Sequence, residues 1–134
     1  MPKIWIGWAP LLALTVGCSR PALLASGPID VDRSPHVVRF ERPIPASGPR
    51  WELCFEFGRP GDSHKAGDIQ AVLLTPSGRR QPFVDVELDR RGESVVCQIG
   101  RVDTGEEVVF ASVELIAPGP VRLRGLRGGS AGSP

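Results

Sequence analysis

The chain has 134 residues, of which 41% are hydrophobic and 23% are charged. These values are ordinary for one soluble globular domain and argue against a chain that is disordered throughout. Lysine and arginine together number 16, against 15 aspartates and glutamates. Binding to duplex nucleic acid usually needs a basic footprint, so this near-neutral balance argues against a nucleic-acid partner.

Residues 1–17 have the character of an export signal. Lys3 gives the start of the chain a positive charge, and residues 4–17 carry no charge at all. As a helix this apolar run would cover roughly 21 Å, which is shorter than the ~30 Å hydrocarbon core of a bilayer. Pro10 would also kink such a helix. A secretory signal is therefore expected here rather than a membrane span.

The run ends in L-T-V-G-C, residues 14–18, which resembles the lipobox of bacterial lipoprotein signals. The resemblance implies that Cys18 receives a diacylglycerol, that residues 1–17 are removed, and that the new amino group is acylated. It implies a bilayer as one partner of the chain. Ser19, where aspartate would favour the inner membrane, points to an outer-membrane anchor facing the periplasm. The alternative is an ordinary secretory signal that is cut nearby, with Cys18 incidental.

Residues 18–28 are predicted to form a lipidated tether. Pro21, Gly27 and Pro28 discourage regular structure in this segment. Ten fully extended residues would reach about 33–36 Å, which sets how far the folded domain could stand from the bilayer.

From residue 29 onward the apolar residues mostly alternate with polar ones, as they do in β-strands with one buried face. In residues 50–57, Trp51 and every second residue after it are apolar. Residues 84–88 read the same way, with Val84, Val86 and Leu88 opposed to acidic residues. Turn sequences rich in Gly, Pro, Ser and Asp separate the runs.

This pattern predicts an all-β domain over residues 29–127, an antiparallel sandwich of about eight strands with an immunoglobulin-like or jelly-roll-like layout. A small barrel is the alternative. Residues 128–134, rich in Gly and Ser, are predicted to be a flexible tail. The fragments I-D-V-D, W-E-L-C-F-E-F and V-E-L-I-A-P-G-P-V-R-L resemble small proteobacterial lipoproteins in which a lipobox leads into one β-sandwich. That resemblance implies a fold and no catalytic residues.

Cys54 and Cys97 are candidates for a disulfide, because an exported chain meets an oxidising compartment. Their strand faces disagree, however. Cys54 shares a face with the charged residues of its strand, whereas Cys97 shares a face with the apolar Val95 and Ile99. Either a bulge or a wrongly assigned face reconciles them, or the thiols are free and Cys97 is a small buried hydrophobe.

The sequence shows no motif for catalysis, a cofactor or a metal ion. The loop at residues 59–68 contains Asp62, Ser63 and His64, but residues adjacent in sequence do not make a triad, and a solvated hairpin loop is expected. The two histidines, His36 and His64, are far apart, and no metal-ligand spacing is present. We therefore predict that the protein is not an enzyme.

Arginines supply the remaining candidate contacts. Arg122, Arg124 and Arg127 lie close together in the sequence and would suit an anionic partner, because guanidinium groups match phosphate and carboxylate. The alternative is that they are solvated and paired with carboxylates on neighbouring strands. The sequence as a whole predicts a membrane-anchored domain that acts through protein contact, as a toxin-immunity protein or an accessory of an envelope or secretion assembly. A module that binds an anionic glycan or lipid is the alternative function.

Overall fold

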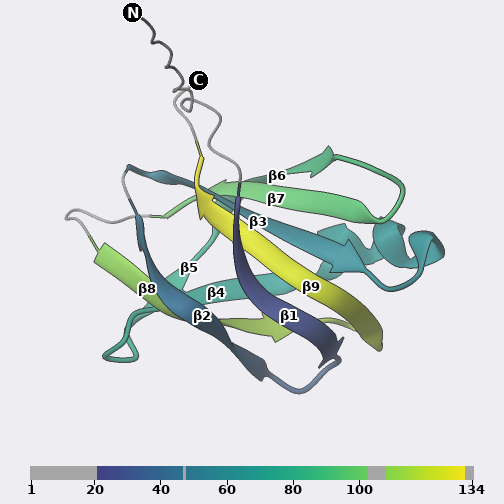
Figure 1. Ribbon diagram of the computed structural model, residues 1–134, viewed down its shortest axis with the longest axis horizontal. Helices are drawn as coiled ribbons and strands as arrows, with labels where there is room; N and C mark the ends of the chain where they lie inside the picture. Colours follow the sequence, from purple (N-terminus) through teal and green to yellow (C-terminus); the bar gives the residue numbers. More distant parts are fainter. Residues whose placement is uncertain (1–20, 47, 103–107, 132–134) are drawn as a thin grey trace, which may run out of the picture.

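Two antiparallel sheets packed face to face make up the fold (Figure 1). The computed structural model describes residues 21–46, 48–102 and 108–131. One sheet has five strands in the order β1-β9-β3-β7-β6, and the other has four in the order β2-β8-β4-β5. The predicted all-β sandwich is thus confirmed, with nine strands in the described residues in place of about eight. Their bounds are β1 Ala22–Val31, β2 His36–Ala46, β3 Arg50–Phe57, β4 Gln70–Leu74, β5 Arg80–Pro82, β6 Val84–Arg90, β7 Val95–Arg101, β8 Val108–Ile116 and β9 Val121–Ser130.

The core lies between the two sheets and is centred on β3. Trp51, Leu53, Phe55 and Phe57 all have 0% exposure, as the alternation in residues 50–57 predicts. Trp51 meets Phe110 of the opposite sheet edge to face, with ring centroids 5.5 Å apart. Burying a large apolar side chain contributes roughly 1.5–3 kcal/mol, so these residues hold the two sheets together.

Strand β1 begins at Ala22, so the tether predicted for residues 18–28 is largely wrong. Leu24 is fully buried, and Ala22 lies opposite Gly128 of β9. Pro28 does not end the strand, because β1 is an edge strand and its register is shifted at this point, where a ladder hydrogen bond is not required. Gly27 allows close approach to β9, since a Cβ there would lie 2.5 Å from the Leu123 carbonyl oxygen.

The predicted tail is also shorter, because β9 runs to Ser130. Gly128 lies between two strands, and a Cβ on it would come within 2.7 Å of the Glu52 carbonyl oxygen. The glycines at this end of the chain therefore serve close packing of the sheet, where the sequence had indicated flexibility. Residues 1–20 and 132–134, including the predicted signal and Cys18, lie outside the described residues.

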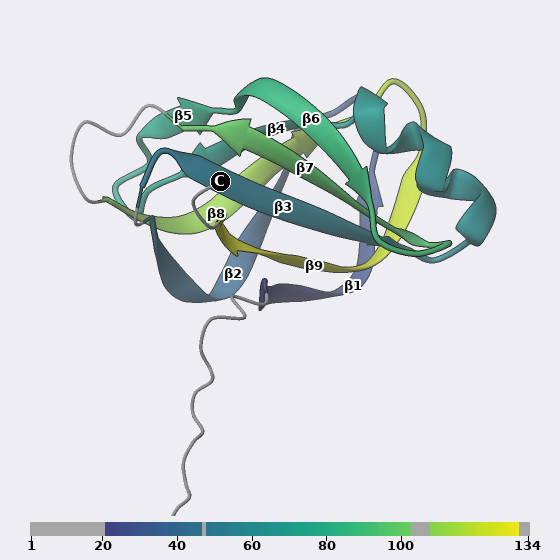
Figure 2. The ribbon, with the colours of Figure 1, turned by 90° about the horizontal axis from the view of Figure 1, so that it is seen from above.

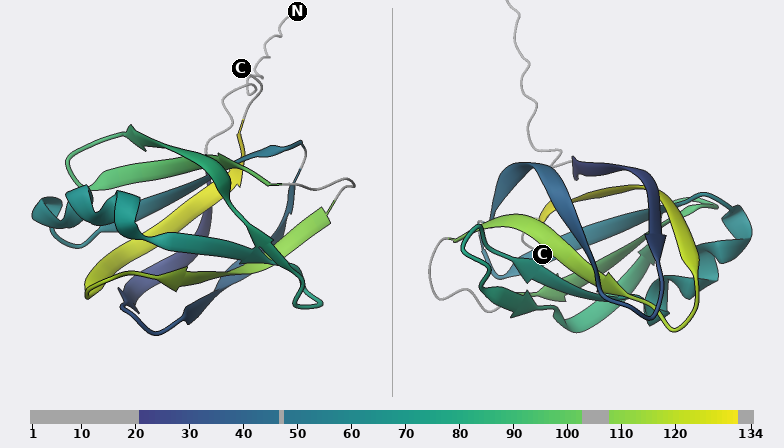
Figure 3. Two further views of the ribbon diagram at one scale, coloured as in Figure 1. Left: turned by 180° about the vertical axis from the view of Figure 1, so that it is seen from behind. Right: turned by 90° about the horizontal axis from the view of Figure 1, so that it is seen from below.

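Residues 60–68 form a 3₁₀ helix, η2 (Pro60–Asp68), and not the predicted hairpin loop. The helix connects β3 of one sheet to β4 of the other and lies at one end of the sandwich (Figures 2 and 3). Gln98 fixes it to the five-stranded sheet, because its buried side-chain amide donates to the carbonyls of Ala66 and Ile69 at 2.9 and 2.7 Å.

Strand β6 departs from its predicted packing. Its alternation predicts Val84, Val86 and Leu88 on a core face, yet they are 48%, 43% and 53% exposed. A register shift between Val84 and Glu87, where Asp85 has a φ of 54°, interrupts the alternation. The strand is also the edge of its sheet. The corresponding edge of the opposite sheet is β5, which has only three residues and is too short to cover the apolar side chains of β6.

Candidate functional site

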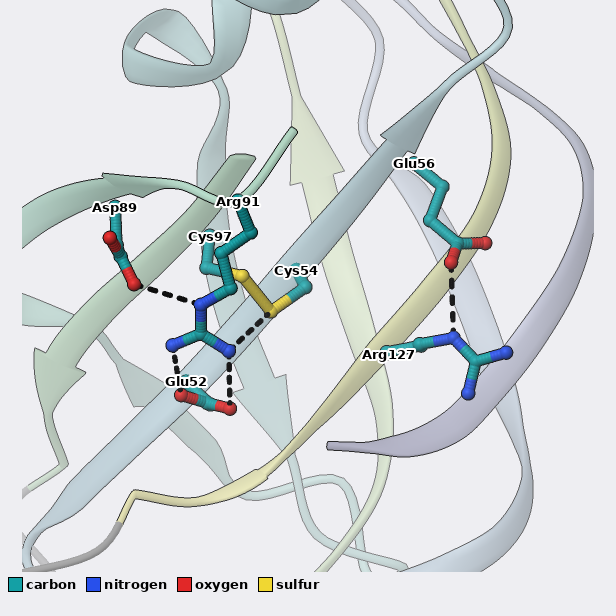
Figure 4. Close-up of a disulfide and its surroundings, with 7 residues drawn as sticks. All are labelled: Glu52, Cys54, Glu56, Asp89, Arg91, Cys97 and Arg127. Carbon is teal, nitrogen blue, oxygen red and sulfur yellow. Dashed lines mark hydrogen bonds and ion pairs between the residues drawn. A yellow bond between two sulfur atoms is a disulfide. The ribbon is translucent and has the colours of Figure 1, made fainter. Parts of the chain in front are cut away.

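The two cysteines of the domain form a disulfide on the outer face of the five-stranded sheet (Figure 4). Cys54 and Cys97 lie directly opposite each other on β3 and β7, with Cα atoms 3.9 Å apart. The face assigned to Cys54 is the observed one. Cys97 does share a face with Val95 and Ile99, as predicted, but this apolar face is the outer face of the sheet and matches that of Cys54. Gln98, on the other face of β7, is buried against η2.

Arg91 covers this disulfide. Its guanidinium donates two hydrogen bonds to the Glu52 carboxylate, at 2.8 and 3.2 Å, and its Nε donates to Asp89 at 2.8 Å (Figure 4). The hydrogen bonds that Arg91 donates to Glu52, and then the one that it donates to Asp89, raise the pKa of Arg91. Cys54 and Cys97 are 2% and 0% exposed. The arrangement is that of a shielded structural disulfide, because reactive cysteines need access to solvent.

The predicted arginine set lies on β9 but does not converge on one site. Arg122 pairs with Asp30 of β1 at 2.8 Å, and Arg127 pairs with Glu56 of β3 at 3.0 Å. The Arg122 hydrogen bond lowers the pKa of Asp30. Among the described residues, Arg124 is the member of the set with no carboxylate partner. Charge on two of the three arginines is thus already balanced within the sheet.

The residues considered for catalysis are engaged separately. Ser63 Oγ accepts a hydrogen bond from Arg90 at 2.9 Å, His64 Nδ1 lies 2.7 Å from the Gly61 carbonyl, and Asp62 pairs with Lys65 at 3.4 Å. Each of these three side chains therefore interacts with a different partner, and not with the other two as a nucleophile, base and orienting acid must.

The part of the chain that the structure describes contains neither a cluster of metal ligands nor a membrane-spanning helix. Nowhere in residues 21–46, 48–102 and 108–131 do three or more His, Cys, Asp or Glu side chains gather as a metal site requires. No helix in the same residues is long and apolar enough to cross a membrane.

The structure exposes a surface that the sequence did not indicate, which we call the β6 edge and define as Val84–Arg90. Five large apolar side chains of the described chain are exposed, and three of them, Val84, Val86 and Leu88, belong to this strand. Val86 and Leu88 lie on the side of the strand that faces η2, whereas Val84 lies opposite Arg101 on the outer face of the sheet. Isolated exposed apolar residues are normal, but neighbouring ones on one face are a feature of contact surfaces.

A groove of about 320 Å³ borders the β6 edge where the two sheets diverge. Its apolar wall comes from both sheets and the chain that joins them, and it includes Ile69, Ala71, Val72, Phe83 and Val86. A larger hollow of about 560 Å³ lies at the end of the sandwich beside Arg33 and Asp68. There Arg33 donates a hydrogen bond to the Pro118 carbonyl at 2.8 Å, so part of its guanidinium is already engaged and less available to a ligand.

The chain matches no family model, no curated protein and no solved structure among those compared with it. The β6 edge therefore has to be interpreted from its own geometry. One signal in the sequence could have located it: residues 85–90 contain three acids and an arginine among six residues, more charge than a well-covered strand usually carries.

Proposed function

We propose that this protein is a lipid-anchored, non-enzymatic domain of the bacterial cell envelope that acts by contacting another protein. The observation that carries the proposal is the β6 edge, where Val86 and Leu88 are 43% and 53% exposed on an edge strand that pairs with β7 alone among the described strands. Apolar side chains gathered in this way lower their free energy by burial against a partner.

The lipobox-like residues 14–18 support the anchor, with Cys18 as the acylated residue. Two or more acyl chains give a stable attachment, since each buried CH₂ contributes about 0.8 kcal/mol. Because β1 begins at Ala22, only residues 19–21 separate Cys18 from the sheet. Four residue steps span at most about 14 Å. The domain would therefore sit close to the bilayer, in place of the 33–36 Å reach that a longer tether would permit.

The proposed anchor precedes β1, and β1 lies at the edge of the sheet opposite the β6 edge. Strand β1 is the first of the five strands and β6 is the last. At about 4.8 Å between neighbouring strands, the two edges are roughly 19 Å apart. This separation leaves the β6 edge accessible to a partner when β1 is held near the membrane. It suits an immunity protein or an assembly accessory in the periplasm, with Ser19 favouring the outer membrane.

The alternative function, binding of an anionic glycan or lipid, has weaker support. It depended on Arg122, Arg124 and Arg127, and the first and last of these are already paired with Asp30 and Glu56. A new anion would have to displace those carboxylates.

Fractionation tests the anchor. We expect Cys18→Ser to move the protein from the membrane fraction to the soluble fraction, because the acylated thiol is lost. Cys54→Ser is the matched control, since its sulfur is in the disulfide, and it should leave the membrane partition unchanged. Persistence of the Cys18→Ser chain in the membrane fraction would contradict the anchor.

Photo-crosslinking in living cells tests the contact. A photoreactive amino acid at Leu88 should give a discrete adduct with a partner protein. The same amino acid at Val37 is the control, because Val37 is 54% exposed and Leu88 is 53% exposed, and both lie on edge strands. Equal crosslinking from both positions, or none from Leu88, would count against the β6 edge.

A further inference from the structure

We infer that the β6 edge binds an extended segment of its partner as a sixth strand of the five-stranded sheet, and that this segment alternates apolar with basic side chains. The inference rests on the protein contact proposed above and is independent of the lipid anchor. It follows from three properties of β6, namely its free backbone edge, its apolar face and its acidic face.

The backbone edge is open. Strand β6 pairs with β7 on one side, and no strand of the described chain pairs with it on the other. An edge of this kind presents unpaired N–H and C=O groups that an added strand can satisfy. Regular pairing with β7 covers residues 87–90, beyond the register shift. An added strand should therefore pair over this part and continue past it as an apolar contact.

The apolar face supplies the contact. Leu88 lies opposite the inward-facing Gln98, and one of its methyl carbons lies beside Gly67 of η2. Val86 lines the groove together with Phe83 and Val72. Side chains of an added strand alternate between the two faces of the sheet. Every second residue of the added strand would thus lie at the mouth of this groove, where an apolar side chain is favoured.

The acidic face selects the remaining residues. Glu87 and Asp89 lie opposite Ile99 and Cys97, which places both carboxylates on the outer face of the sheet. Asp89 is bonded to Arg91. Among the described residues, Glu87 forms no ion pair. Directly opposed charges of opposite sign stabilise paired strands, so lysine or arginine is favoured on this face of the added strand.

A second copy of the chain is a poor occupant. Antiparallel pairing of two β6 strands centred on Glu87 would place Glu87 against Glu87 and Asp85 against Asp89. Directly opposed like charges destabilise a strand pair. The strand therefore favours a different, basic segment over its own copy, which is how natural edge strands avoid self-association.

Display of random 12-residue peptides tests the inference with the full chain carrying Cys18→Ser, so that lipid plays no part. We expect the enriched peptides to alternate apolar residues with lysine or arginine. Leu88→Thr, which keeps a strand-forming residue but removes apolar surface, should weaken the best peptide at least tenfold. Val37→Thr on β2 is the matched control and should bind the peptide as the parent does.

Charge reversal gives a second, sharper readout. Glu87→Lys should lower affinity for the basic peptides at least fivefold and shift the enriched pool toward acidic residues. Glu87 is exposed and in no ion pair of the described chain, so the variant should fold, which thermal unfolding will check. Amide hydrogen exchange should slow in residues 87–90 when the best parent peptide is added.

Three results would overturn strand addition: no enriched peptide, enriched peptides without the alternation, or peptides that bind Leu88→Thr as well as the parent. Crosslinking from Leu88 in cells together with any of these would leave the contact proposal standing and show that the partner uses a folded surface. Loss of both the crosslink and the peptides would contradict the contact and the strand addition together.

Discussion

The two edge strands of the five-stranded sheet, β1 and β6, differ in how far their apolar side chains are buried. Strand β1 buries Leu24, Ile29 and Val31 to 5% exposure or less. Strand β6 leaves Val84, Val86 and Leu88 at 43% exposure or more. Both strands lie at an edge of the same sheet, so position in the sheet alone does not determine burial.

The difference comes from the opposite sheet. Strand β1 packs against β2, an 11-residue strand that lies across from it. Strand β6 follows directly after β5, which has three residues and marks the end of the four-stranded sheet. An edge strand with a full partner layer completes the core, whereas one without it retains apolar surface for another molecule. The predictions that follow test this contrast, beginning with the largest effect.

Removal of the disulfide should have the largest effect, because it fixes β7, which among the described strands is the one that pairs with β6. The linked cysteines are 43 residues apart, and closing such a loop is worth about 4 kcal/mol on the chain-entropy model. We expect the double variant Cys54→Ala, Cys97→Ala to lose about this much unfolding free energy in urea. The parent chain unfolded with reductant is the control and should match the variant. A loss below about 1 kcal/mol would show that the bridge contributes little.

Truncation on β1 should cost nearly as much. Leu24 has 0% exposure, so Leu24→Ala removes buried methyl groups and leaves a cavity. A loss of about 3 kcal/mol of unfolding free energy is expected. The loss is measured by urea denaturation. A loss under about 1 kcal/mol would mean that Leu24 contributes little to the core and belongs to a tether, as the sequence had predicted.

Arg91→Ala should have an intermediate effect near β6. It removes the bidentate partner of Glu52, whose carboxylate is largely buried, and a loss of about 1–2 kcal/mol is expected. Arg127→Ala is the control, because its ion pair with Glu56 is more exposed and should contribute below about 1 kcal/mol. Equal losses of unfolding free energy in the two variants would contradict the claim that the Arg91–Glu52 pair stabilises the fold more than the exposed Arg127–Glu56 pair does.

Leu88→Ala on β6 is the direct counterpart of Leu24→Ala. Because Leu88 is 53% exposed, the expected loss of unfolding free energy is below about 1 kcal/mol. Circular dichroism during urea unfolding measures both variants under the same conditions. A cost equal to that of Leu24→Ala would place Leu88 in the core and end the contrast between the two edges.

Acidification should produce the smallest effect, at the Asp30–Arg122 pair that joins β1 to β9. The pKa of Asp30 lies below its usual 3.8, chiefly because Arg122 donates a hydrogen bond to the carboxylate. A lowered pKa in the folded state contributes stability above pH 3.8, and this contribution is lost as the pH falls through the folded value. Titration by NMR should return Asp30 to its usual pKa in Arg122→Gln, and an unchanged pKa would contradict the assignment.

Much of the fold could be predicted from the sequence, because the period-two alternation in residues 50–57 places Trp51, Leu53, Phe55 and Phe57 in the core. In residues 109–116 the alternation holds for Val113 and Leu115, but Phe110 is buried and Val109 is exposed. The ends of the domain could not. Gly27 and Pro28 usually interrupt strands, and only the register with β9 shows that they sit at an irregularity of an edge strand. Local sequence does not reveal whether a glycine provides flexibility or permits close packing.

The contact surface was missed for a related reason. Alternation in residues 84–88 identifies a strand with an apolar face, but it carries no information on what the other sheet places against that face. The length of β5 decides this, and β5 is too short to leave a pattern. The facing of Cys97 failed similarly, because both faces of β7 contain apolar residues and only the pairing with β3 distinguishes them.

Amide hydrogen exchange on the protein in its native envelope tests the central claim most directly. In the purified chain, amides of the open β6 edge should exchange quickly, and those of the buried part of β1 slowly. In the envelope fraction the account predicts slowed exchange over Val84–Arg90 with little change over Ala22–Val31. Equal exchange of β6 in both samples would contradict a role for this edge in binding a partner.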